Sequence, residues 1–113
     1  MKEIKAIIRP GKLLEVTEEL HAIEGLPGVT VSEIKGFGKG KAQNAKDSVF
    51  YEMVKFIPRI QLEVVVNDEM VADVVNVIQK YAHTGNTGDG KIFVSTVDDI
   101  VKIRTNERGR DAI

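Results

Sequence analysis

Two short segments near the end of the chain carry the residue types that hold phosphate groups. The first is residues 84–91, TGNTGDGK, and the second is residues 102–105, KIRT. Glycine has no Cβ and tolerates positive φ, so successive backbone N–H groups can turn together toward an anion. Lys91 would add a point charge and Arg104 a two-pronged guanidinium. The two segments therefore predict a site for a phosphorylated small molecule.

Each segment also has an ordinary structural explanation. Residues 88–90 are consistent with a plain turn between a helix and a strand. Lys102 and Arg104 are consistent with alternate positions on an exposed sheet face, where basic residues are common. The sequence leaves both alternatives open.

Composition excludes many other functions. The chain has 113 residues, no cysteine, 42% apolar and 29% charged residues, and a net charge of −1. We expect one soluble, cytoplasmic domain with no disulfide, thiolate zinc site, signal peptide or membrane span. We expect no nucleic-acid partner, because the chain lacks a basic field and its predicted strands are aliphatic apart from Phe93.

Groups suited to catalysis are scarce. His21 falls among the polar positions of a predicted helix, His83 closes the next one, and the acidic pair 98–99 is adjacent in sequence and shares no face. We therefore predict no catalytic residue, no metal site and no enzymatic activity. A phosphohistidine-type enzyme with His83 as nucleophile is the enzymatic alternative.

The hydrophobic pattern repeats a strand–helix–strand unit. Alternation over residues 4–8 predicts a strand, helical spacing from Leu13 to Ile23 a helix, and β-branched residues at 29–35 a second strand. The second half repeats this with a strand at 60–66, a helix over 71–82 and a strand at 91–95, followed by a short strand at 100–104. Asn67 or Asp68 is expected to cap the second helix and Gly85 to end it.

This order predicts an α+β fold, a ferredoxin-like split βαβ sandwich (βαββαβ) with both helices on one face of the sheet. We expect self-association or a partner to cover the other face, because a bare apolar sheet face would aggregate. Residues 36–58 form a connection much longer than compact domains require. They predict either a long β-ribbon or a mobile recognition loop.

Five motifs in this order resemble the P-II signal transduction (nitrogen regulatory) family. They are IKAIIRP at 4–10, VTVSEIKGFG at 29–38, FIPR at 56–59, the glycine-rich residues 84–94, and IRT with ERG between 103 and 109. The resemblance covers essentially the whole chain and implies a single P-II-like domain over residues 1–113. It further implies a homotrimer that binds ATP or ADP in clefts between neighbouring subunits. A mobile T-loop, about 38–56, would respond to the nucleotide and select the target protein.

The resemblance also assigns residues to this site by position. On the adenine and ribose side it places Thr30, Gly36, Gly38, Lys39, Glu63 and Val65. On the phosphates it places Gly88, Asp89, Gly90, Lys91, Lys102 and Arg104, and it adds Phe37 and Phe93 to the nucleotide site. In the T-loop the residues expected to contact the partner are Lys41, Lys46, Phe50, Tyr51 and Glu52. The partner implied is an enzyme, a transporter or an efflux pump.

Several positions depart from the family pattern. Glu52 stands where many members carry a uridylylated tyrosine, so we expect no uridylylation, although Tyr51 lies one residue earlier. Gly40 replaces a glutamine that ligates Mg²⁺, and Arg59 replaces a lysine that holds a 2-oxoglutarate carboxylate. We therefore do not expect Mg²⁺ and 2-oxoglutarate to bind in the usual geometry. Ser48 replaces an arginine that plugs an ammonium transporter channel.

The extra residue within 24–28 and the junction at 82–85 resemble a divergent branch of the family. Members of that branch are associated with heavy-metal efflux pumps. Regulation of such a pump is therefore the alternative to regulation of nitrogen metabolism or transport.

Overall fold

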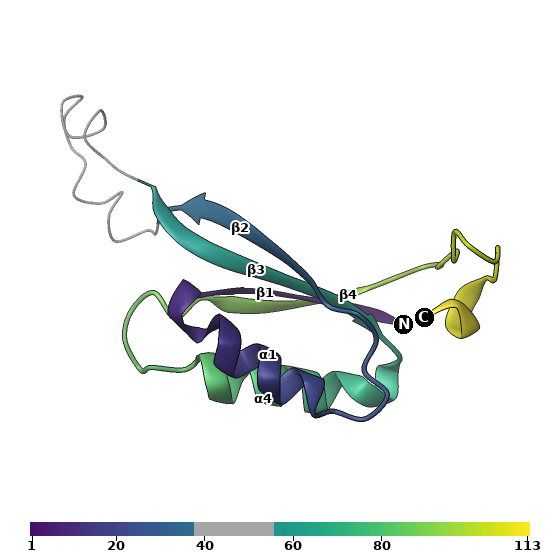
Figure 1. Ribbon diagram of the computed structural model, residues 1–113, viewed down its shortest axis with the longest axis horizontal. Coiled ribbons are helices and arrows are strands. Elements are labelled where there is room, and N and C mark those ends of the chain that lie inside the picture. Colours follow the sequence, from purple (N-terminus) through teal and green to yellow (C-terminus); the bar gives the residue numbers. More distant parts are fainter. Residues whose placement is uncertain (38–55) are drawn as a thin grey trace.

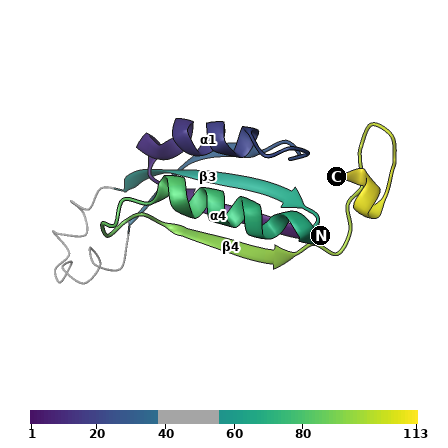
Figure 2. The ribbon, with the colours of Figure 1, turned by 90° about the horizontal axis from the view of Figure 1, so that it is seen from below.

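A four-stranded antiparallel sheet lies at the centre of the computed structural model, which describes residues 1–37 and 56–113. The strands are β1 (Lys2–Ile8), β2 (Thr30–Gly36), β3 (Ile57–Val66) and β4 (Lys91–Thr96), in the spatial order β2-β3-β1-β4. Helices α1 (Leu13–His21) and α4 (Val71–Ala82) both cover one face of this sheet (Figures 1 and 2). The fold is thus the predicted α+β ferredoxin-like sandwich.

The helix-covered face of the sheet forms the hydrophobic core. Every second residue of β1 and β3 points to the helices, and each helix contributes residues at the spacing of a single stripe. Burying each valine, leucine or isoleucine side chain in this core contributes roughly 1.5–3 kcal/mol. The buried residues of the two central strands are Ile4, Ala6, Ile8, Ile60, Leu62, Val64 and Val66, and those of the helices are Val16, Leu20, Val74, Ile78 and Ala82.

The other face of the sheet has no second layer in the described residues. In the register of the strands, Thr30 lies opposite Glu63, Lys5 opposite Phe93, and Ile7 opposite Lys91. Phe93 is nearly half exposed, and the Lys5 ammonium lies 5.8 Å from the centre of its ring. This open face therefore mixes charged and apolar side chains.

Helix starts and ends differ from the prediction. Neither Asn67 nor Asp68 caps α4 with its side chain. Instead the Asn67 carbonyl accepts a bond from the Met70 N–H at 3.0 Å, and a 3-10 turn, η2 (Asp68–Met70), leads into the helix. A similar turn, η1 (Pro10–Lys12), precedes α1. At the other end, α4 stops at Ala82, three residues before Gly85, because His83 is already extended.

The predicted strand at 100–104 is wrong. Only Val101 forms a bridge, and its partner is Arg108, not a strand of the sheet. The backbone N–H of Asn106 bonds to the carbonyl of Lys102 at 2.7 Å, which closes a turn at the positions expected to be extended. Residues 97–108 therefore form a short excursion, here called the C-terminal hairpin, followed by the 3-10 turn η3 (Gly109–Ala112).

Two aromatic rings lie at the ends of the described part on either side of residues 38–55. Phe37 follows β2 and Phe56 precedes β3, and their ring centres are 5.4 Å apart with a tilt of 54°. This is a favourable geometry for an aromatic pair. The pair lies next to the last rung of the β2–β3 ladder, where Gly36 faces Ile57.

Candidate functional site

Residues 84–90, here called the glycine loop, join α4 to β4 at the end of the sheet where β2 finishes and β3 begins (Figure 1). Gly88 and Gly90 have φ values of +99° and +96°, a backbone conformation that residues with a side chain rarely adopt. Gly90 also lies directly on β1, since a Cβ at this position would be 1.7 Å from the carbonyl oxygen of Ile7. Only glycine fits there. The loop is thus built against the sheet.

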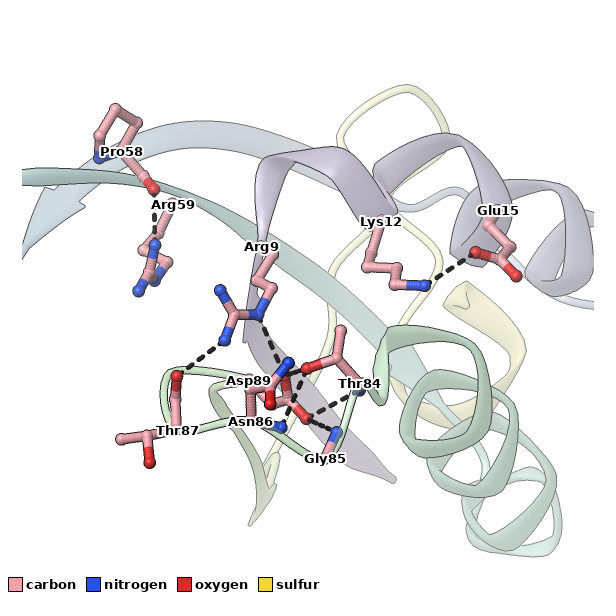
Figure 3. A network of polar contacts seen from close by, with 10 residues as sticks. All are labelled: Arg9, Lys12, Glu15, Pro58, Arg59, Thr84, Gly85, Asn86, Thr87 and Asp89. Carbon is pink, nitrogen blue, oxygen red and sulfur yellow. Dashed lines mark hydrogen bonds and ion pairs between the residues drawn. The ribbon is translucent and has the colours of Figure 1, made fainter.

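The carboxylate of Asp89 organises the glycine loop from within (Figure 3). One oxygen accepts bonds from the backbone N–H groups of Thr84, at 2.8 Å, and Gly85, at 2.9 Å. The other accepts from the Thr84 hydroxyl and from Nε of Arg9, the latter at 3.0 Å. Bonds from the Thr84 hydroxyl and backbone, then from Gly85 and Arg9, hold the pKa of Asp89 well below its usual range. The predicted contact of Asp89 with a nucleotide stays a prediction; the bonds described for its carboxylate come from Thr84, Gly85 and Arg9.

Arg9 makes a second bond to the glycine loop. Its Nη2 donates to the carbonyl oxygen of Thr87 at 2.7 Å, in addition to the bond from Nε to Asp89. Arg9 and Thr84 were not among the predicted site residues. Arg9 lies within the IKAIIRP motif at 4–10, but nothing in the sequence connects it with Asp89, eighty positions away.

A hollow of about 370 Å³ opens beside the glycine loop on the open face of the sheet. We call it the anion hollow. Among the described residues, its lining includes three cationic ones, Lys35, Arg59 and Lys91, and no acidic one. The remaining lining residues are glycines and apolar side chains, namely Ile7, Ile34, Gly36, Phe37, Ile57, Gly88, Gly90 and Phe93. A flat apolar group with an attached polyanion fits this arrangement chemically.

The structure brings together only part of the predicted nucleotide site. Six of the predicted residues line the anion hollow: Gly36, Phe37, Gly88, Gly90, Lys91 and Phe93. A second group lies toward the other end of β2 and β3, where Thr30, Glu63 and Val65 line a separate hollow of about 270 Å³. Since Thr30 is six residues from Gly36 along β2, the two groups are separated by about 20 Å.

The C-terminal hairpin lies beside the second group of residues, at the Thr30 end of β2. Ile100 lines the same hollow as Thr30 and Glu63. Within the hairpin, Nζ of Lys102 lies 3.7 Å from Oε1 of Glu107, and Arg104 is exposed. The hairpin lies at the opposite end of the sheet from the glycine loop (Figure 1). One chain therefore does not bring Lys102 and Arg104 to the loop that they were predicted to assist.

The remaining predicted residues lie outside the described part of the chain. They are Gly38 and Lys39 of the nucleotide site and Lys41, Lys46, Phe50, Tyr51 and Glu52 of the T-loop.

Three further observations concern groups outside the anion hollow. Within residues 1–37 and 56–113, no three His, Cys, Asp or Glu residues gather as a metal site would require. His83 lines a neighbouring hollow between α4 and β4 and is not part of the anion hollow. No helix in the described part combines the length and apolar character needed to cross a membrane.

Comparison with known proteins relates the whole chain to one group of regulators. The family described as "Nitrogen regulatory protein P-II" matches residues 1–107. Proteins of this name from Azospirillum brasilense and Rhodospirillum rubrum are 49% and 48% identical to the chain, each over the full length of both sequences. Among solved structures, Arabidopsis thaliana PII bound to citrate superposes with a TM-score of 0.78 at 37% identity. That match covers 99% of this chain and 91% of the Arabidopsis chain.

Proposed function

This chain belongs to the nitrogen regulatory protein P-II family, and we propose that it acts by sensing ADP or ATP at the anion hollow. The family is described as regulatory, and its members are not named as enzymes. The names of the relatives also favour nitrogen metabolism or transport over heavy-metal efflux as the process regulated.

One observation carries the nucleotide proposal, namely the composition of the anion hollow. Lys35, Arg59 and Lys91 line it, with no acidic residue from 1–37 or 56–113 beside them, and the two positive-φ glycines Gly88 and Gly90 expose their backbone there. Phosphate oxygens are held by this combination of N–H groups and cations, whatever the remaining side chains. The apolar lining suits the adenine base. The Arabidopsis relative was solved with citrate, which is also a compact anion.

We propose that a homotrimer completes the site. Thr30, Glu63 and Val65 lie about 20 Å along the strands from Gly36, at whose end of the sheet the glycine loop lies, and the C-terminal hairpin is at the Thr30 end (Figure 1). In a ring of subunits, this end of one chain would meet the glycine loop of the next. Lys102 and Arg104 would then reach phosphates held by a neighbour. The open sheet face would be covered by the same association.

The regulatory output is proposed to pass through the T-loop. Residues 38–55 leave the sheet at Phe37, whose ring lines the anion hollow, and return at Phe56. ATP and ADP would switch a target only through the difference in their affinity for the two states of this loop. Gly40 offers no side-chain oxygen and Arg59 replaces lysine, so the proposal includes neither Mg²⁺ nor 2-oxoglutarate in the usual geometry.

Isothermal titration with ADP, ATP, AMP and 2-oxoglutarate tests the proposal. We expect ADP and ATP to bind, and the double variant Lys91→Ala with Arg104→Ala to bind ADP more than about 100-fold more weakly, since each charged hydrogen bond contributes about 1.5–3 kcal/mol. Lys80→Ala, which removes a charge from the exposed side of α4, is the control and should bind normally. Unchanged ADP affinity in the double variant contradicts the site assignment. Light scattering of the same samples should give three chains per particle.

A further inference from the structure

Two arginines approach Gly88 from outside the glycine loop, and they are used differently. A Cβ built on Gly88 would lie 3.2 Å from Nη2 of Arg59 and 3.3 Å from Nη2 of Arg9. Arg59 donates to the carbonyl of its own neighbour, Pro58, and faces the anion hollow. Arg9 is not among the residues that line the hollow. Proximity to Gly88 alone therefore does not give the two side chains the same role.

The guanidinium of Arg9 is committed to two acceptors in the glycine loop. Nε donates to the Asp89 carboxylate at 3.0 Å and Nη2 to the Thr87 carbonyl at 2.7 Å. Both side chains of the ion pair are largely shielded, with exposed fractions of 29% for Arg9 and 23% for Asp89. Figure 3 shows Arg9 above the loop, with dashed lines to Thr87 and to Asp89. A planar fork of this kind sets the spacing of its two acceptors, which a point charge does not.

The residue between these acceptors is the one whose backbone needs support. Gly88 has a left-handed φ of +99°, and glycine loses more conformational entropy on ordering than any other residue. The two bonds from Arg9, to Thr87 and to Asp89, form a clamp that restricts the backbone of Gly88 before any ligand binds. Preorganisation of this kind raises affinity without a direct contact.

We propose that Arg9 is a positioning residue, which holds residues 87–89 in their binding conformation through Thr87 and Asp89 and does not itself contact the ligand anion. The proposal deepens the function proposed above and rests on it for its ligand. It assigns the two arginines separate tasks, with Arg59 facing the ligand and Arg9 facing the loop.

The first test is made on the ligand-free protein, by amide hydrogen exchange at Gly88 and Gly90. Arg9→Gln should speed exchange there by about tenfold or more, because the local opening energy falls when the clamp is removed. Arg9→Lys should do nearly the same, since one ammonium cannot bridge both acceptors. Lys80→Gln removes the same charge from α4 and should leave the loop unchanged. Unaltered exchange in Arg9→Gln, or full rescue by lysine, overturns the proposal.

The second test separates positioning from direct binding of the anion. Titration with ADP should give about 10- to 100-fold weaker binding for Arg9→Gln. If Arg9 acts through Asp89, adding Asp89→Asn should cost little more, so the two losses are strongly non-additive. Additive losses would make Arg9 a ligand contact and overturn the proposal. If the unaltered protein binds no adenine nucleotide, the proposed function fails, while the exchange measurement still decides the role of Arg9.

Discussion

The glycine loop and the C-terminal hairpin carry the two halves of one predicted phosphate site, yet the chain holds them in opposite ways. Gly90 sits against the Ile7 carbonyl, and Asp89 is bonded to Arg9 across the loop. In the described part of the chain, the hydrogen bonds of residues 101–108 are instead made within the hairpin itself. Ile103 at its tip is 99% exposed. The loop is therefore organised by its own chain, whereas the hairpin presents its residues outward.

Gly90→Ala is expected to produce the largest effect. The left-handed backbone alone costs a residue with a side chain roughly 1–3 kcal/mol. A Cβ at this position would also overlap the Ile7 carbonyl oxygen, and β1 is a central strand that cannot move aside. Denaturant unfolding should show a loss of stability greater than about 2 kcal/mol, and ADP binding should be lost with it.

Gly11→Ala is the matched control for this change. Gly11 has no atom within 4 Å of its built Cβ and is not among the residues with positive φ. Its substitution should change stability by less than about 0.5 kcal/mol. Equal effects of the two alanines would show that the glycine loop is no more tightly built than an exposed turn.

Ile103→Asp tests whether the hairpin works between chains. The side chain is solvent-exposed within its own chain, so the variant should keep its secondary structure by circular dichroism. Burying an isoleucine contributes about 1.5–3 kcal/mol, and a trimer would contain three such contacts. We expect light scattering to show dissociation at micromolar concentration. Weaker nucleotide binding should accompany it.

Leu14→Asp provides the comparison for the hairpin variant. Leu14 is also a large exposed apolar residue, but it lies on α1, on the helix side of the sheet. The same change there should leave the assembly intact. If both variants assemble like the unaltered protein, the hairpin has no role in association.

Asp89→Asn is expected to give the smallest effect, and one that depends on pH. An amide has one acceptor oxygen where the carboxylate uses two, so bonds from Thr84, Gly85 or Arg9 are lost. Because hydrogen bonds hold the pKa of Asp89 below its usual 3.8, its contribution is fully present above that pH and declines as the pH falls. Thermal melting should separate the two proteins at pH 7 and bring them together toward pH 2.

Asp98→Asn serves as the control for the titration. Asp98 is exposed and lies beyond β4, away from the glycine loop. It should melt like the unaltered protein at both pH values. A difference between Asp89→Asn and the unaltered protein that stays constant from pH 7 to pH 2 would mean that the carboxylate charge does not organise the loop.

Local pattern was sufficient to predict most of the fold. Residues 4–8 and 60–66 alternate strictly enough to specify both central strands, and the stripe from Val71 to Ala82 gives α4 its length. The misassigned strand at 100–104 has the same alternation. These residues form a turn instead, because the backbone of Lys102 makes hydrogen bonds with the backbone of Glu107 and Asn106 within the hairpin. Alternation describes which side chains share a face, but it does not supply a neighbouring strand.

The site was harder to predict from sequence than the fold. The glycines at 88 and 90 predict a tight turn, and the basic residues at 91 and 104 predict a site for an anion. The motif at 4–10 contains Arg9, but its bond to Asp89, eighty residues away, could not be predicted from residue type or spacing. The separation of the predicted site residues at the two ends of β2, Thr30 and Gly36, could not be predicted either. It depends on how the strands run and pair, and residue type does not show this.

The paired rings of Phe37 and Phe56 have a consequence for how such a protein diversifies. The two rings pack together at a centre-to-centre distance of 5.4 Å, one just after β2 and the other just before β3, on either side of residues 38–55. Doubling the length of a closed loop costs only about 0.6 kcal/mol. An insertion or replacement between these two rings therefore leaves the strands beneath almost untouched.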